Sequence, residues 1–267
     1  MNQLYALRNE IEGLVEDYAA DLVDPAVAAA FLNYADGWIP APALAYSSAD
    51  APSYEVTCSG DYSGIITPGC RVKLTHSGST KYFIVTKASH ADGTTTITLY
   101  GGTDYTLAAG AITSPYFSTH KAPRGFPLSP AKWTVTVTDS SERSQGSPVA
   151  NTWYNLGSIS ISIPIGCWWM QYCALLQVNV SPVGWCNMFS TLSTSNNSES
   201  HPAHTLKIGG MSFASNSQSV VLPRTLIDLA TKTTYYLNGK IDVTGGTDIY
   251  FQGAQQVTKI ELVCAYL

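Results

Sequence analysis

The chain has 267 residues and a mass of 28.6 kDa, which allows one large domain or two to three small ones. Charged residues make up only 12% of it, and a mean hydropathy of +0.03 excludes both a disordered chain and a membrane protein. The net charge is −5, and the few lysines and arginines are scattered, which excludes the basic stripe that nucleic acid binding requires. We therefore expect no nucleic acid partner and no insertion into a membrane.

Residues 1–52 are predicted to be an N-terminal helical segment for trimerisation and attachment, followed by a linker. Apolar residues recur there at the spacing of a coiled-coil seam: Leu4, Leu7, Ile11, Leu14 and Tyr18. The helix either packs on its own domain or bundles with copies of itself, and we favour the second arrangement. A second helix is expected from Pro25 to about residue 34 with Asp24 as N-cap, and the proline-containing residues 40–52 are expected to be an extended linker.

Residues 53–118 are predicted to form a small antiparallel β-barrel. Short segments of alternating polar and apolar residues, such as 71–76 and 94–100, follow one another with turns at regular intervals. The pair Asp92-Gly93 is a strong hairpin signal. Residues 119–130 contain three prolines, each of which removes a ladder hydrogen bond, so this stretch is predicted to be a second linker.

Residues 131–267 are predicted to form a C-terminal antiparallel β-sandwich of jelly-roll type. Residues 157–163 place isoleucine on one face and serine or glycine on the other, so one side of that strand is buried. Residues 167–176 are apolar on both faces and require cover from the sandwich core and from a loop or a neighbouring subunit. The pair Asn238-Gly239 is typical of a two-residue hairpin. The expected fold class is mainly β, with a short helical stem, a small barrel and a sandwich.

The cysteines and histidines do not indicate a metal site or a cofactor. The six cysteines form no C-x-x-C pair and have no zinc-site spacing with histidine: Cys58, Cys70, Cys167, Cys173, Cys186 and Cys264. We expect reduced thiols, while a bridge between Cys58 and Cys70 stays open. His201 and His204 would hold a metal only if three copies met on a symmetry axis, and a plain polar loop is the favoured interpretation.

We expect no enzymatic activity and no catalytic residue. Few carboxylates follow residue 52, and most lie at turn signals instead of forming the rigid pair that glycoside hydrolysis needs. The nucleophile-elbow, P-loop and dinucleotide-binding patterns are missing from the sequence.

Aromatic residues are the most informative class for function. The chain holds six Trp, 16 Tyr and seven Phe on a weakly charged β scaffold rich in Ser, Thr and Asn. Aromatic rings stack on sugar C–H groups, and amide and hydroxyl side chains bond to sugar hydroxyls. The candidate ligand-binding residues are Trp153, Tyr154, Trp168, Trp185, Asn187, Asn196, Asn197, Glu199 and His201. For each tryptophan, packing in the core is the alternative.

Several segments of the chain resemble parts of bacteriophage tail and fibre appendage proteins, including receptor-binding proteins. The segments are a stem-like seam at residues 4–18, barrel-module patterns at 75–87, 101–107 and 122–127, and fibre-head patterns at 192–197 and 233–238. No motif among them assigns a role to a single residue.

The resemblance implies a homotrimeric virion protein that contacts other virion proteins through its N-terminal segment and a host cell-surface glycan through its β-rich tip. Such proteins are made in the host cytoplasm without a signal peptide, which fits the charged, periodic start of this chain. A structural baseplate, head-fibre or decoration component is the alternative. A glycan-depolymerising tailspike and a secreted lectin are less favoured.

Overall fold

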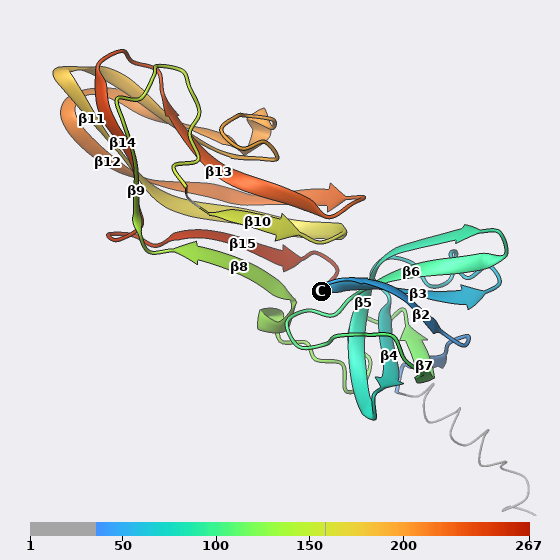
Figure 1. The fold of residues 1–267 in the computed structure, drawn as a ribbon. Helices are drawn as coiled ribbons and strands as arrows, with labels where there is room; N and C mark the ends of the chain where they lie inside the picture. The colour runs from blue at the N-terminus through green and yellow to red at the C-terminus, as the bar shows by residue number, and fades with distance from the viewer. Residues whose placement is uncertain (1–35, 158) are drawn as a thin grey trace, which may run out of the picture.

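The computed structural model describes residues 36–157 and 159–267, which form two β modules (Figure 1). The expected mainly-β fold is confirmed, with a seven-stranded, nearly closed barrel-like sheet and a second, eight-stranded sheet. The seam at residues 4–18 and the helix expected over residues 25–34 lie outside the described residues. The described part has two 3-10 turns, η1 (Pro130–Trp133) and η2 (Pro202–His204), and no helix long and apolar enough to cross a membrane.

The barrel-like sheet is antiparallel, in the order β1-β7-β4-β5-β6-β3-β2. Its strands are β1 (Ile39–Pro40), β2 (Ala45–Asp50), β3 (Ser53–Ser59), β4 (Arg71–His76), β5 (Ser79–Ala91), β6 (Thr94–Tyr100) and β7 (Ile112–Ser118). A register shift between Val85 and Lys87 bends β5, which pairs with β4 before the bend and mainly with β6 after it. The bend lets a single sheet curl around its own apolar core.

Two predictions for this module have clear outcomes. The hairpin at Asp92-Gly93 is confirmed, because these residues join β5 to β6 with positive φ angles of 49° and 74°. The linker expected over residues 40–52 is wrong, since the edge strands β1 and β2 lie within or across it. Proline at Pro40 misled the prediction: an edge strand tolerates proline because one side of it needs no ladder partner.

The second sheet is built around one long antiparallel pair, β11 (Gly166–Ser193) and β12 (Thr205–Leu229). The remaining strands are β8 (Thr134–Asp139), β9 (Glu142–Gly146), β10 (Ser160–Ile163), β13 (Thr233–Ile241), β14 (Gly246–Gln252) and β15 (Thr258–Cys264). A register shift between Asn179 and Gly184 divides β11. We call layer A the part of the sheet in which β11 pairs with β14 and β15, together with β9, which pairs with β14, and β8, which pairs with β15. We call layer B the part in which residues 184–193 of β11 lie with β13, and β13 in turn pairs with β10.

The two layers pack face to face at Gly239. A Cβ atom on Gly239 would lie 3.3 Å from side-chain atoms of Leu176 and Phe251, which belong to layer A. The hairpin predicted at Asn238-Gly239 is therefore wrong: β13 runs straight through both residues. Glycine is needed here because the opposite layer approaches closely, and not because the chain turns.

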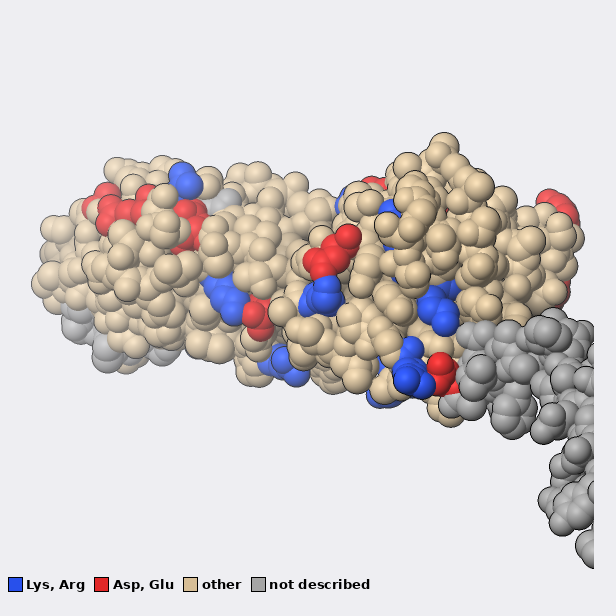
Figure 2. Space-filling view, turned by 90° about the horizontal axis from the view of Figure 1, so that it is seen from below, with Lys and Arg blue, Asp and Glu red and all other residues tan. Residues whose placement is uncertain are grey.

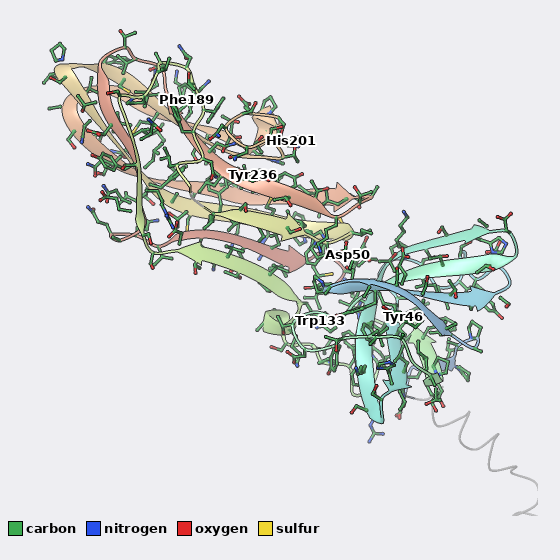
Figure 3. The ribbon with its side chains drawn as sticks, viewed as in Figure 1. Tyr46, Asp50, Trp133, Phe189, His201 and Tyr236 are labelled. Carbon is green, nitrogen blue, oxygen red and sulfur yellow. The ribbon has the colours of Figure 1, made fainter. Side chains whose placement is uncertain are left out.

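An aromatic cluster joins the two modules (Figure 3). The rings of Phe126 and Trp133 stack with centroids 5.2 Å apart, and Tyr100 of the barrel-like sheet meets Trp168 of β11 edge-on at 4.9 Å. Residues 119–129 contain no strand or helix, but Phe126 anchors them in this cluster. Arg71 crosses the joint as well, because its guanidinium bonds to carbonyls of both modules.

The strand predicted to be apolar on both faces is covered on one face within a single chain. Trp168, Met170 and Tyr172 are buried in the core, whereas Trp169 on the opposite face is 36% exposed. The neighbouring strand β12 adds Val221, which is 60% exposed on that same side. Association of copies through this face stays a prediction.

Candidate functional site

The sheet geometry sorts the side chains of residues 185–189 onto two faces of layer B. Cys186 and Met188 are buried in the core. Because side chains alternate along a strand, Trp185, Asn187 and Phe189 point outward. We call the surface formed by Trp153, Trp185, Asn187, Phe189, Lys207, Lys240 and Asp242 the outer face of layer B.

A row of aromatic and cationic side chains crosses this face at Phe189, which Figure 3 labels on layer B. Phe189 lies opposite Lys240 of β13 on one side and Lys207 of β12 on the other. The Nζ atom of Lys240 lies 4.6 Å from the ring centroid of Trp153 and 4.8 Å from that of Phe189, while Nζ of Lys207 lies 5.7 Å from the latter. Both ammonium groups, one from each neighbouring strand, therefore lie within cation–π range of the ring of Phe189.

The next row along the strand holds an amide and a carboxylate in fixed positions. The backbone N–H of Asn187 donates to Oδ1 of Asp242 at 2.8 Å, and its side-chain Nδ2 donates to Oδ2. Two residues further, Trp185 is 65% exposed. A rigid amide–carboxylate pair therefore lies between two aromatic side chains, one of them open to solvent.

A polar loop, residues 194–201, closes the opposite end of the face. Asn238 is fully buried beneath it, donating to the carbonyls of Ser195 (3.1 Å) and Ser198 (2.7 Å). Asn197 is fixed twice: its N–H donates to Oδ1 of Asn238, and its Oδ1 accepts from the N–H of Asn155. The loop is thus held in one conformation by hydrogen bonds to layer B.

Glu199 and the two histidines lie at the base of this loop. Oε1 of Glu199 accepts from Oγ1 of Thr205 at 3.0 Å, and the His201 and His204 rings lie 5.1 Å apart. Burial and then the neighbouring His201 lower the pKa of His204 below its usual value. The described residues contain no group of three His, Cys, Asp or Glu side chains placed to hold a metal.

The structure separates some of the predicted ligand-binding residues from the rest. Trp168 is fully buried at the joint and cannot contact a ligand, which corrects its assignment. Tyr154 packs against the core, and its hydroxyl accepts the N–H of Val149. Asn196 is exposed at the tip of the loop. Trp185, Asn187, Asn197 and Glu199 lie on or beside the outer face of layer B. Trp153 also reaches this face but is only 9% exposed, with Nζ of Lys240 over its ring, so its assignment as a ligand-contacting residue is corrected as well.

Sequence analysis missed Phe189, Lys207, Lys240 and Asp242. The alternation of residues 185–189 contained the signal for Phe189, because it shares parity with Trp185 and Asn187. The two lysines come from other strands and Asp242 directly follows β13, so only the pairing of strands brings them to the face.

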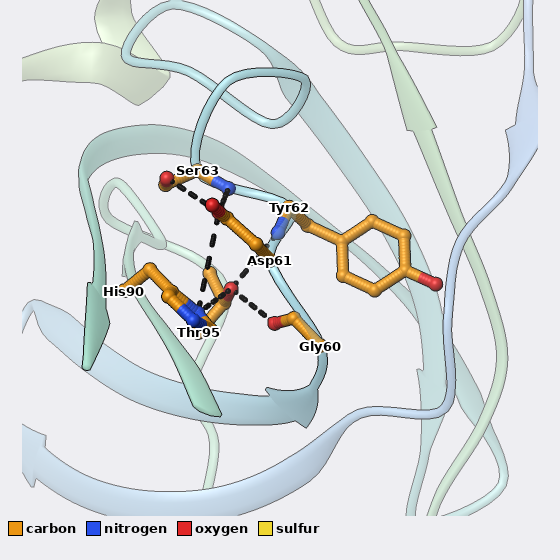
Figure 4. Close-up of polar contacts among 6 residues, drawn as sticks. All are labelled: Gly60, Asp61, Tyr62, Ser63, His90 and Thr95. Carbon is orange, nitrogen blue, oxygen red and sulfur yellow. Dashed lines mark hydrogen bonds and ion pairs between the residues drawn. The ribbon is translucent and has the colours of Figure 1, made fainter. Parts of the chain in front are cut away.

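A second polar cluster, on the barrel-like sheet, tests whether the protein carries a catalytic triad (Figure 4). Nδ1 of His90 lies 4.0 Å from Oδ1 of Asp61 and 3.3 Å from Oγ1 of Thr95. A triad needs the acid and the hydroxyl on different ring nitrogens, whereas both lie at the same nitrogen here. Thr95 is also buried and donates its proton to the carbonyl of Gly60. The cluster ties a loop to the sheet, because Thr95 of β6 donates to the carbonyl of Gly60 and accepts from the N–H of Tyr62, while Asp61 accepts from Ser63 within the loop.

The thiols, all of which lie within residues 36–157 and 159–267, are not arranged for reactivity. All six cysteines are free, including Cys58 and Cys70. Burial raises the pKa of Cys186 and of Cys264 to about 11, which disfavours the reactive thiolate. Charged side chains are sparse on the face drawn in Figure 2, and no continuous basic stripe crosses it.

No protein-family model matches the sequence, and no curated protein matches it significantly. Among solved structures, dimeric latent PorU from Porphyromonas gingivalis is similar with 9% identity and a TM-score of 0.30, over 85% of this chain and 24% of that one. The Gx strain of infectious bursal disease virus follows with 12% identity and a TM-score of 0.29, over 84% of this chain and 59% of that one. The VP2 subviral particle of that virus shows 13% identity and a TM-score of 0.23, over 84% of this chain and 63% of that one. This chain spans less than two thirds of each of them, and such TM-scores are too low to support an argument.

Proposed function

We propose that this protein is a non-enzymatic bacteriophage virion component that attaches to a saccharide on the host cell surface through the outer face of layer B. The observation that carries the proposal is the convergence of Trp185, Asn187, Asp242 and Phe189 on one rigid sheet face. Such a face offers a flat aromatic surface beside fixed hydrogen-bonding groups, which is the chemistry of sugar recognition.

The architecture supports recognition without catalysis. Rigid strands place the face, and hydrogen bonds from Asn238 hold the adjoining loop. In the cluster of Asp61, His90 and Thr95, the hydroxyl of Thr95 donates to the backbone carbonyl of Gly60 and is not free to act as a nucleophile. We propose that three copies, joined by the seam at residues 4–18 as in a jelly-roll-headed appendage, present three such faces and bind with avidity.

The proposal is tested by retention of fluorescently labelled protein on host bacteria, with and without periodate oxidation of surface sugars. Trp185→Ala should lower retention by about two- to thirteenfold, because stacking of one aromatic side chain is worth about 0.5–1.5 kcal/mol. Leu128→Ala, which removes a 53% exposed apolar side chain from the segment between the two modules, is the matched control. Retention unaffected by periodate and by Trp185→Ala would contradict the proposal.

A purely structural role in the virion is the second candidate, and the joint between the modules favours it. A receptor binder needs only a rigid tip, whereas the stacking of Trp133 on Phe126 and the bonds of Arg71 make the whole described chain a stiff spacer. A spacer would not be retained on host cells in the same assay.

A further inference from the structure

The outer face of layer B holds two ammonium groups that lack a carboxylate partner. Lys207 and Lys240 flank Phe189 from the two neighbouring strands, with their Nζ atoms 5.7 Å and 4.8 Å from its ring centroid. Neither forms an ion pair with a carboxylate of the described residues. Three other lysines of this part of the chain do pair in that way: Lys132, Lys232 and Lys259.

Two like charges brought together on a surface repel each other, and an anion placed between them removes that repulsion. The aromatic rings hold the ammonium groups in place but do not neutralise them. The row at Phe189 is therefore a preformed position for one negatively charged group.

The carboxylates nearest to this row are engaged on either side of it. Asp242 uses both oxygens to accept from Asn187, and Glu199 accepts from Thr205. Asp242 is two residues from Lys240 on β13, a separation of roughly 7 Å along the strand. The two ammonium groups thus have Asp242 on one side and Glu199, beside the face, on the other, and carboxylates with free lone pairs accept hydrogen bonds from sugar hydroxyls.

We infer that the outer face of layer B binds an acidic saccharide, with one carboxylate or phosphate group over Phe189 between Lys207 and Lys240. Hydroxyl groups of the same saccharide bond to Asp242 and Glu199. The flanking carboxylates repel a densely charged polyanion, so the face selects saccharides whose anionic groups are widely spaced. This inference rests on the proposed function and names the class of saccharide.

The test is an array of bacterial surface saccharides that carries uncharged, carboxylate-bearing and phosphate-bearing members, probed with the full chain. Wild-type protein should bind acidic members and not their uncharged counterparts, and the array shows which acid is bound. Lys207→Gln and Lys240→Gln should each weaken binding at least about tenfold, as loss of a charged hydrogen bond does. Lys87→Gln, on an exposed position of β5, should change nothing. Thermal melting shows that each variant is folded, and Lys207 is exposed, so its replacement spares the core.

Three outcomes would overturn the inference. Equal binding of uncharged saccharides, or unchanged binding by both lysine variants, overturns the acidic class and leaves attachment to surface sugars standing. Retention on host cells without binding to any saccharide overturns the saccharide ligand altogether. If the wild-type protein neither binds any saccharide on the array nor is retained on host cells, both the inference and the proposed function are overturned.

Discussion

Replacing Arg71 with methionine is expected to loosen the joint between the two modules. Arg71 is fully buried, and its guanidinium donates to the carbonyls of Gly69 (2.7 Å), Tyr266 (2.8 Å) and Lys121 (3.1 Å). The guanidinium carbon Cζ of Arg71 also lies 5.0 Å from the ring centroid of Phe126. Methionine keeps an unbranched apolar stem against that ring but has no hydrogen to donate.

Two opposing effects set the size of the change. Each bond from a charged donor contributes about 1.5–3 kcal/mol, and three are lost. Against this, burial lowers the pKa of the Arg71 guanidinium, which shows that its charge is held at a cost that methionine removes. We expect the free energy of unfolding to fall by about 2–4 kcal/mol, because Lys121 is exposed and water can replace its lost donor.

The Arg71→Lys variant separates these effects. Lysine keeps the buried charge but cannot meet three carbonyls that are arranged around a planar fork, so we expect a loss at least as large as with methionine. Urea unfolding followed by tryptophan fluorescence is the assay, since Trp133 and Trp168 lie in the joint. Lys87→Met on the barrel-like sheet is the control. A methionine variant with the control's urea midpoint, or a lysine variant as stable as wild type, would refute this reasoning.

Three further predictions concern layer B. Asn238→Ala removes two donated hydrogen bonds and one accepted bond, so chemical denaturation should show a free energy of unfolding about 2–3 kcal/mol lower. Unchanged amide hydrogen exchange in the polar loop would contradict the role of Asn238 as its anchor. Gly239→Val should lower the free energy of unfolding by about 1–3 kcal/mol through overpacking against layer A, whereas a melting temperature at or above wild type would show that the layers are not pressed together there. Burial lowers the pKa of His204 from 6.5, so His204 takes up a proton at a higher pH in the unfolded protein than in the folded one. The free energy of unfolding should therefore be highest above pH 6.5 and fall as the pH drops through the pKa of His204 in the folded protein. His204→Asn should flatten this loss in urea midpoints between about pH 7.5 and about pH 5.5, and the same change at exposed His120 should not.

The alternation of polar and apolar residues was sufficient to predict most of the strands. Residues 71–76 and 94–100 form β4 and β6 within the expected bounds, because each strand buries one face and the period of two shows which one. The turn at Asp92-Gly93 was equally local, since its positive φ angles are a property of those two residues.

The same local signals failed where the tertiary structure gives a residue another task. Asn238-Gly239 has the composition of a hairpin turn, yet Asn238 anchors the polar loop and Gly239 makes room for layer A. Trp168 is of a residue type that often binds sugars, yet its ring packs edge-on against Tyr100 of the other module. The residues that Asn238, Gly239 and Trp168 contact lie far from them in the sequence. No pattern within a few residues can therefore predict these contacts.

What the sequence determined by itself is the mainly-β class, the positions of the short strands and the choice of aromatic and amide side chains as candidates for binding, because these depend on composition and on neighbours within one strand. Only the tertiary structure decided that Phe189, Lys240 and Lys207 form one row, since three strands from different parts of the chain have to pair in one register to bring them together. Register is a property of the whole sheet, and a shift by a single residue would turn each of these side chains to the other face.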